Sequence, residues 1–146
     1  MTAFGSHYIS PSQDQGATAD NMLRLGFSSN RYKELYAVDG SINTSDINEK
    51  QDIQELTDAE QRVALACKGL IRRYKWNHAV EEKGEDARYH IGIMAQDLQQ
   101  AFTDEGLDAS NYGLFTLDTW ENEDGTEETR LGVRYNELLA FIISAI

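Results

Sequence analysis

Cysteine is nearly absent from this sequence, and the single Cys67 excludes an internal disulfide. Cys67 falls on the apolar side of an expected helix, and no base stands beside it. This placement favours a small core residue over a nucleophile. The start of the chain lacks a basic segment followed by an apolar run, so we expect no signal peptide. The longest apolar run, near the C-terminus, is too short to span a bilayer.

Basic residues are also scarce, since 13 Lys and Arg face 25 Asp and Glu, for a net charge of −12. This balance disfavours binding to nucleic acid or to anionic lipid, so we expect neither as a partner. The three histidines, His7, His78 and His90, are too scattered to form an evident metal site. No glycine-rich phosphate loop is present, and we expect no cofactor.

A length of 146 residues, 40% of them hydrophobic, fits either one domain or one domain with a short appendage. Three basic and four acidic residues precede Ser45, whereas ten and twenty-one follow from that residue on, giving net charges of −1 and −11. The pattern of apolar residues also changes near Ser45, from one typical of short strands to one typical of helices. We therefore divide the chain into residues 1–44 and residues 45–146.

Residues 1–20 are polar and rich in Gly, Ser and Thr, while Met22 to Thr44 is typical of short strands. Asp39–Gly40 is a strong turn signal, and Ser41 to Thr44 fits a returning strand. One hairpin cannot bury itself alone. We therefore interpret residues 1–44 as the C-terminal end of a larger β-rich stalk that lies upstream.

The sequence of residues 45–146 predicts an α+β fold with small antiparallel strands. Thr57 and Glu60 form a capping-box pair, followed by apolar residues at helical spacing, Val63, Ala66, Cys67 and Leu70. The remaining expectations, in chain order, are a strand at Ile71–Trp76, a loop at Glu81–Asp86, a strand at Tyr89–Met94, a helix at Ala95–Phe102, a hairpin of Leu114–Trp120 with Thr129–Tyr135, and an apolar helix at Leu138–Ile146. This last helix is either a core helix or an oligomer seam.

The segment from Asn43 to Lys50 contains a candidate nucleophile and base, Ser45 and Lys50. A serine hydroxyl attacks well only when a base takes its proton, and a lysine can do this when burial lowers its pKa. Five residues along an α-helix rotate a side chain by about 140°, so the pair can meet only if Ser45 precedes the helical part. The same spacing arises by chance in many proteins, and Ser45–Asp46 is also an ordinary N-cap pair.

This segment resembles the Ser-Asp-x-Arg-x-Lys signature of the peptidase S74 family, the intramolecular chaperone auto-processing domain of phage tail fibres, tailspikes and endosialidases. Asn48 stands where that signature has Arg. Three later segments resemble the family in the same order, and they are Arg72–Trp76, Ile91–Leu98 and Leu131–Leu139. The upstream stretch from Gly26 to Ala37 is similar to the β segment that commonly precedes the cut in phage members.

The resemblance implies self-cleavage between Thr44 and Ser45, with Ser45 as the nucleophile and Lys50 as its base in a Ser-Lys dyad. It implies an intertwined homotrimer that folds the upstream β domain of the same chain in the host cytoplasm, before the fibre joins the virion tail. The apolar C-terminal helix then suits the trimer seam. The alternative is a permanent trimeric fibre tip that never cuts and serves as a structural or receptor-binding module.

Overall fold

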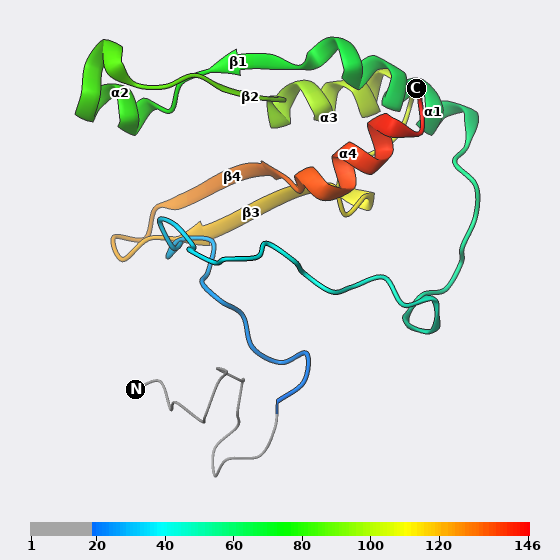
Figure 1. The fold of residues 1–146 in the computed structure, drawn as a ribbon, viewed down its shortest axis with the longest axis horizontal. Coiled ribbons are helices and arrows are strands. Elements are labelled where there is room, and N and C mark those ends of the chain that lie inside the picture. Colours follow the sequence, from blue (N-terminus) through cyan, green and yellow to red (C-terminus); the bar gives the residue numbers. More distant parts are fainter. Residues whose placement is uncertain (1–18) are drawn as a thin grey trace. The chain divides into compact units, whose positions relative to one another are not determined.

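The computed structural model of the chain describes residues 19–146 (Figure 1). Its contacts divide the chain into two units, with the boundary between Ser41 and Ile42. The two units are described separately below. Across residues 19–146, no helix combines the length and the apolar character that a membrane crossing needs.

Residues 19–44 contain no strand, so the prediction of short strands between Met22 and Thr44 is wrong for this structure. The predicted bend at Asp39–Gly40 is present, because the Asp39 carboxylate accepts hydrogen bonds from the backbone and the hydroxyl of Ser41 at 3.0 and 2.7 Å. Within residues 19–146 no strand pairs with this segment, and apolar side chains such as Val38 remain fully exposed. A lone hairpin with no surface to cover is marginal in water, which explains the missing sheet.

Helix α1 spans Asp58–Cys67 and begins with the predicted capping box. The Glu60 carboxylate accepts the Thr57 N–H at 2.7 Å, and the Thr57 hydroxyl accepts the Glu60 N–H at 3.3 Å. These two bonds satisfy donors that the first helical turn would otherwise leave unpaired. The helix buries Val63, Ala64 and Cys67, so its inward face includes Ala64 rather than the predicted Ala66.

Two short strands follow α1 and form an antiparallel ribbon, β1 at Arg72–Tyr74 and β2 at His90–Gly92. Between them lies helix α2, Asn77–Lys83, which continues into a 3-10 turn, Gly84–Asp86. The predicted loop at Glu81–Asp86 is therefore wrong, because the helix carries on through this charged stretch and ends only at Gly84, whose φ is +58°. A glycine adopts this conformation without steric cost and terminates the helix. The ribbon carries α2 at its far end, away from the other helices (Figure 1).

The C-terminal half supplies helix α3, Ala95–Asp104, the hairpin strands β3, Phe115–Glu121, and β4, Glu127–Val133, and helix α4, Tyr135–Ile143. The hairpin was predicted, and its strands extend further toward the tip than expected. Its register pairs Phe115 with Val133 and Glu121 with Glu127. The tip turns at Gly125, which has a φ of +83°. Residues 42–146 therefore form an α+β unit with two separate antiparallel strand pairs.

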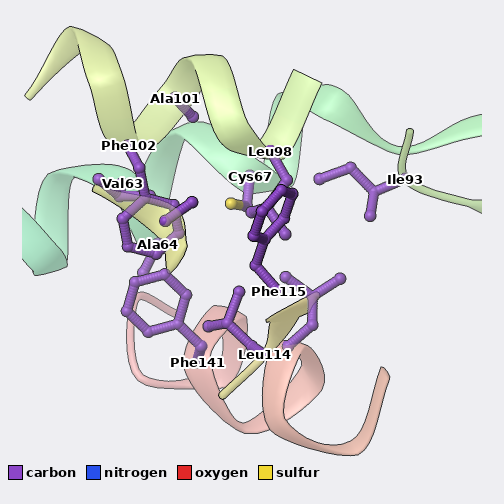
Figure 2. Close-up of a cluster of buried hydrophobic side chains, with 12 residues drawn as sticks. Val63, Ala64, Cys67, Ile93, Leu98, Ala101, Phe102, Leu114, Phe115 and Phe141 are labelled. Carbon is purple, nitrogen blue, oxygen red and sulfur yellow. The ribbon is translucent and has the colours of Figure 1, made fainter. Parts of the chain in front are cut away.

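The core lies where α1, α3, α4 and the start of β3 meet (Figure 2). Phe102 is fully buried, and its ring lies 4.6 Å from that of Tyr112 and 6.0 Å from that of Phe141. Cys67 is fully buried as predicted, and this burial raises the pKa of its thiol to about 11. The buried members of the core are all hydrophobic: Val63, Ala64, Cys67, Ile93, Leu98, Ala101, Phe102, Ala109, Leu114, Phe115, Leu138 and Phe141.

Candidate active site

The segment from Ser45 to Lys50 forms one tight turn. Ser45 has a φ of +88°, in the left-handed region that favours glycine. Asp46 and Lys50 have extended backbone, and Ile47–Glu49 between them form the 3-10 helix η2. The Lys50 N–H closes the turn by donating to the Ile47 carbonyl at 3.1 Å. These residues thus form one short 3-10 turn flanked by extended backbone.

The turn places the Lys50 side chain against Ser45. Lys50 Nζ donates a hydrogen bond to Ser45 Oγ over 2.6 Å. The contact is possible because the residues on either side of η2 are extended, whereas a continuous α-helix would separate the two side chains by about 140°. The structure thus brings the two candidate residues together. Both are exposed in the single chain, and Thr44 precedes them in an exposed stretch without regular structure.

Asp46 occupies the N-cap of η2 and bonds its neighbour Asn48. One carboxylate oxygen, Oδ1, accepts the backbone N–H of Asn48 at 2.9 Å and the side-chain Nδ2 at 2.9 Å. Capping of this kind satisfies a donor that the first turn leaves open. Asp is a common residue at such caps, but the sequence alone did not assign Asn48 this contact.

A serine hydroxyl held against a lysine amine has the geometry of a nucleophile and its base. A neutral amine at this distance can accept the hydroxyl proton as the oxygen attacks a carbonyl. The left-handed backbone of Ser45 adds strain, which for a residue other than glycine is of order 1–3 kcal/mol. The strained residue and the Ser-Lys contact therefore lie at the same peptide junction, that of Thr44 and Ser45.

No group of three or more His, Cys, Asp or Glu side chains within residues 19–146 is placed to hold a metal ion. His78, in α2, and His90, in β2, lie instead in a cluster of aromatic rings with Tyr74 and Trp76. His78 stacks on Trp76 with ring centroids 6.1 Å apart, and His90 stacks on Tyr74 at 5.8 Å. These ring contacts fit the structural role expected of the two histidines, which stays a prediction, and His7 lies outside the described residues.

Comparison with known proteins identifies the family. The sequence model of the family described as chaperone of endosialidase, peptidase S74, matches residues 45–107. A probable tail spike protein of Klebsiella phage 0507-KN2-1 is 49% identical over 104 residues, which cover 70% of this chain and 8% of that protein. The side tail fiber protein pb1 of Escherichia phage T5 is 36% identical over 120 residues, covering 75% of this chain and 8% of that protein. The chain thus spans a small part of the length of both relatives.

Two solved structures share the fold. The carboxy-terminal domain of the bacteriophage T5 L-shaped tail fiber, with its intramolecular chaperone domain, matches with a TM-score of 0.73 and 31% identity, over 87% of this chain and 34% of that one. A structure described as a novel intramolecular chaperone matches with a TM-score of 0.61 and 32% identity, over 69% of this chain and 93% of that one. The chain belongs to the chaperone of endosialidase family.

The segments that carried the resemblance to this family meet in the structure. Arg72–Trp76 contains β1, Ile91–Leu98 joins β2 to α3, and Leu131–Leu139 joins β4 to α4. The last two are linked by Tyr135, whose hydroxyl accepts the Ile93 N–H at 3.1 Å and donates to the Ile93 carbonyl at 3.3 Å. This link across 42 residues ties the ribbon to the core of the chaperone of endosialidase domain. The sequence patterns did not predict the contact between Tyr135 and Ile93, because such patterns describe single elements and these two residues belong to different parts of the fold.

Proposed function

We propose that residues 45–146 are the C-terminal intramolecular chaperone of a phage tail fibre or tailspike, and that this domain frees itself by cutting the Thr44–Ser45 bond. Residues 1–44 are then the end of the upstream fibre. The observation that carries the proposal is the 2.6 Å contact of Lys50 Nζ with Ser45 Oγ, directly after Thr44. The family and the named functions of its phage relatives support the chaperone role.

The reaction begins with attack of Ser45 Oγ on the carbonyl carbon of Thr44. Lys50, as a neutral amine, accepts the hydroxyl proton and returns it to the Ser45 nitrogen as the peptide C–N bond breaks. The Thr44 acyl group is then held as an ester on Ser45 Oγ. Water hydrolyses this ester and leaves a carboxylate on Thr44 and a free hydroxyl and amine on Ser45. The turn supplies proximity, and the strained backbone at Ser45 relaxes when the bond is cut.

Assembly gives a physical reason for the timing of the cut. Lysine amines in water are protonated at neutral pH and cannot accept a proton, whereas removal from water favours the neutral form. Ser45 and Lys50 are both exposed in the single chain, so a neighbouring subunit is needed to exclude water from them. Cleavage that waits for the trimer would report correct folding, and loss of the chaperone would then make unfolding of the fibre kinetically difficult.

The outer face of α4 supports a homotrimer. Leu139, Ile143 and Ile146 recur at i, i+4 and i+7, so they form one stripe along the helix and into the residues after it. Their exposed fractions are 53%, 64% and 88% in the single chain. Apolar stripes of this kind mark contact surfaces. A trimer seam along this stripe suits a domain that holds three fibre chains together while they fold in the host cytoplasm, before the fibre joins the virion tail.

The decisive experiment is the intact mass of the purified chain beside Ser45→Ala and Lys50→Ala, with the oligomeric state of each measured by light scattering. We expect the parent to split into residues 1–44 and 45–146, and both variants to stay whole while forming trimers. Nicked trimers can remain associated, so denaturing mass measurement is required. A parent that stays whole as a folded trimer would refute self-cleavage and leave the permanent fibre tip as the function.

A further inference from the structure

The contact between Asn48 and Asp46 has no part in the proposed proton transfer, yet it lies inside the turn that joins the two reacting side chains. Both the backbone N–H and the side-chain Nδ2 of Asn48 donate to Oδ1 of Asp46, each at 2.9 Å. Asn48 is also the position at which this chain departs from the Arg of the signature motif. The neutral amide of Asn48 therefore makes a contact within the turn that Ala at this position could not make.

The turn has little else to hold it. Its two backbone bonds are the Glu49 N–H to the Asp46 carbonyl at 3.3 Å and the Lys50 N–H to the Ile47 carbonyl at 3.1 Å. A single 3-10 turn has poor hydrogen-bond geometry and is marginal by itself. None of the residues of η2 is buried, so hydrophobic packing within the described chain adds little. Hydrogen bonds to a charged carboxylate are stronger than those between neutral groups, so the two bonds that Asn48 donates to Asp46 restrain the turn more than its two backbone bonds do.

The restraint matters because Lys50 reaches Ser45 only while the turn is formed. Lys50 follows η2 directly, and its backbone N–H is one of the donors that close the turn. When the turn opens, the extended chain carries the amine away from Ser45 Oγ. A long lysine side chain samples many rotamers, so a fixed backbone is needed to keep its amine within hydrogen-bond reach.

We propose that Asn48 is a positioning residue for self-cleavage, which acts by pairing with Asp46 to hold the turn that aims Lys50 at Ser45. The inference rests on the proposed function, since it concerns the rate of that reaction. Asn48 has no contact with the reacting atoms, so its effect is on geometry and not on proton transfer itself. In this chain the Asp46–Asn48 pair holds the turn although the position of the signature Arg carries no positive charge.

The test is the rate of self-cleavage of pulse-labelled chain made by cell-free synthesis, followed on denaturing gels, with trimer formation followed in parallel on native gels. Asn48→Ala removes the Nδ2 donor and should slow cleavage by roughly threefold to tenfold, the range for one exposed hydrogen bond, without slowing trimer formation. Asn48→Ser keeps a donor on a short side chain and should recover most of the rate. Asn48→Asp places a second carboxylate beside Asp46 and should be slower than Asn48→Ala. Gln51→Ala, at an exposed neighbour outside the turn, is the matched control and should cleave like the parent.

The outcomes separate this inference from the function on which it rests. If the parent cuts in a Lys50-dependent way and Asn48→Ala cuts at the parental rate, the positioning role is wrong and self-cleavage stands. If Asn48→Ala slows trimer formation as much as cleavage, or Asn48→Ser is no faster than Asn48→Ala, Asn48 is structural and the inference also fails. If the parent never cuts, the proposed function fails and the inference falls with it.

Discussion

A methyl group added at Gly92 should collide with Tyr135, a side chain that ties the β1–β2 ribbon to the core. A Cβ at this position would lie 2.2 Å from Tyr135 Oη, closer than real Cβ atoms approach, and 3.1 Å from Tyr135 Cζ, which is tighter than most real contacts. The same hydroxyl bonds the N–H and the carbonyl of Ile93 at 3.1 and 3.3 Å. Gly92→Ala therefore has to displace the tyrosine ring and break both bonds.

The expected cost follows from these two effects. Two partly buried hydrogen bonds contribute about 1 kcal/mol each, and overpacking of a close contact adds about 1–3 kcal/mol, so Gly92→Ala should destabilise the domain by about 3–5 kcal/mol. Tyr135→Phe removes the hydroxyl without a clash and should cost about 2 kcal/mol. The double variant should cost at least about 1 kcal/mol less than the sum of the two, because the atom that collides with the new methyl is gone.

The measurement is urea unfolding, followed by circular dichroism at one fixed protein concentration, since association shifts the apparent stability. All variants should carry Ser45→Ala, so that self-cleavage does not mix two species. Gly69→Ala is the control, because a Cβ at Gly69 meets no atom within 4 Å. A Gly92→Ala variant as stable as Gly69→Ala, or single effects that simply add, would refute the argument.

Two further predictions concern titratable groups. Because burial raises the pKa of the Cys67 thiol to about 11, the folded protein should react with Ellman's reagent at pH 8 far more slowly than the urea-unfolded protein, and stability should fall as pH rises above about 9, where only the unfolded thiol ionises. Equal reaction rates of the folded and unfolded protein would contradict the buried placement. The pKa of Glu60 is lowered first by the Thr57 N–H and then by the Tyr112 hydroxyl, so its stabilising effect should be present above the ordinary glutamate pKa and lost as pH falls through the lowered one. Urea unfolding between pH 3 and pH 6 should show this loss in the parent and a flatter profile in Glu60→Gln; identical profiles would contradict the assignment.

The site illustrates what local sequence can and cannot provide. The chemical types at Ser45 and Lys50 allowed a nucleophile and a base, and the family resemblance pointed to that pair. The argument from helical rotation required Ser45 to precede the helical part, and the structure places it there. The bond between Asn48 and Asp46 was not predicted, although Asp is a common residue at such caps. The roles of Ser45, Lys50 and Thr44 in cleavage stay predictions until the mass of the chain is measured.

The sequence alone specified the elements that depend on interactions between residues close together in the chain. The capping box at Thr57 and Glu60, the helix at Ala95 and the β3–β4 hairpin depend on hydrogen bonds and side-chain periods that span a few residues, so their signals are local. The predicted strands before Thr44 failed because a strand needs a partner, and the sequence of one segment does not say whether a partner is present. Only the tertiary structure decided that Tyr135 would close on Ile93, 42 residues away, and that Ala64 rather than Ala66 would face the core. Such contacts depend on how whole elements pack against one another, and that packing is a property of the entire chain and not of any local pattern.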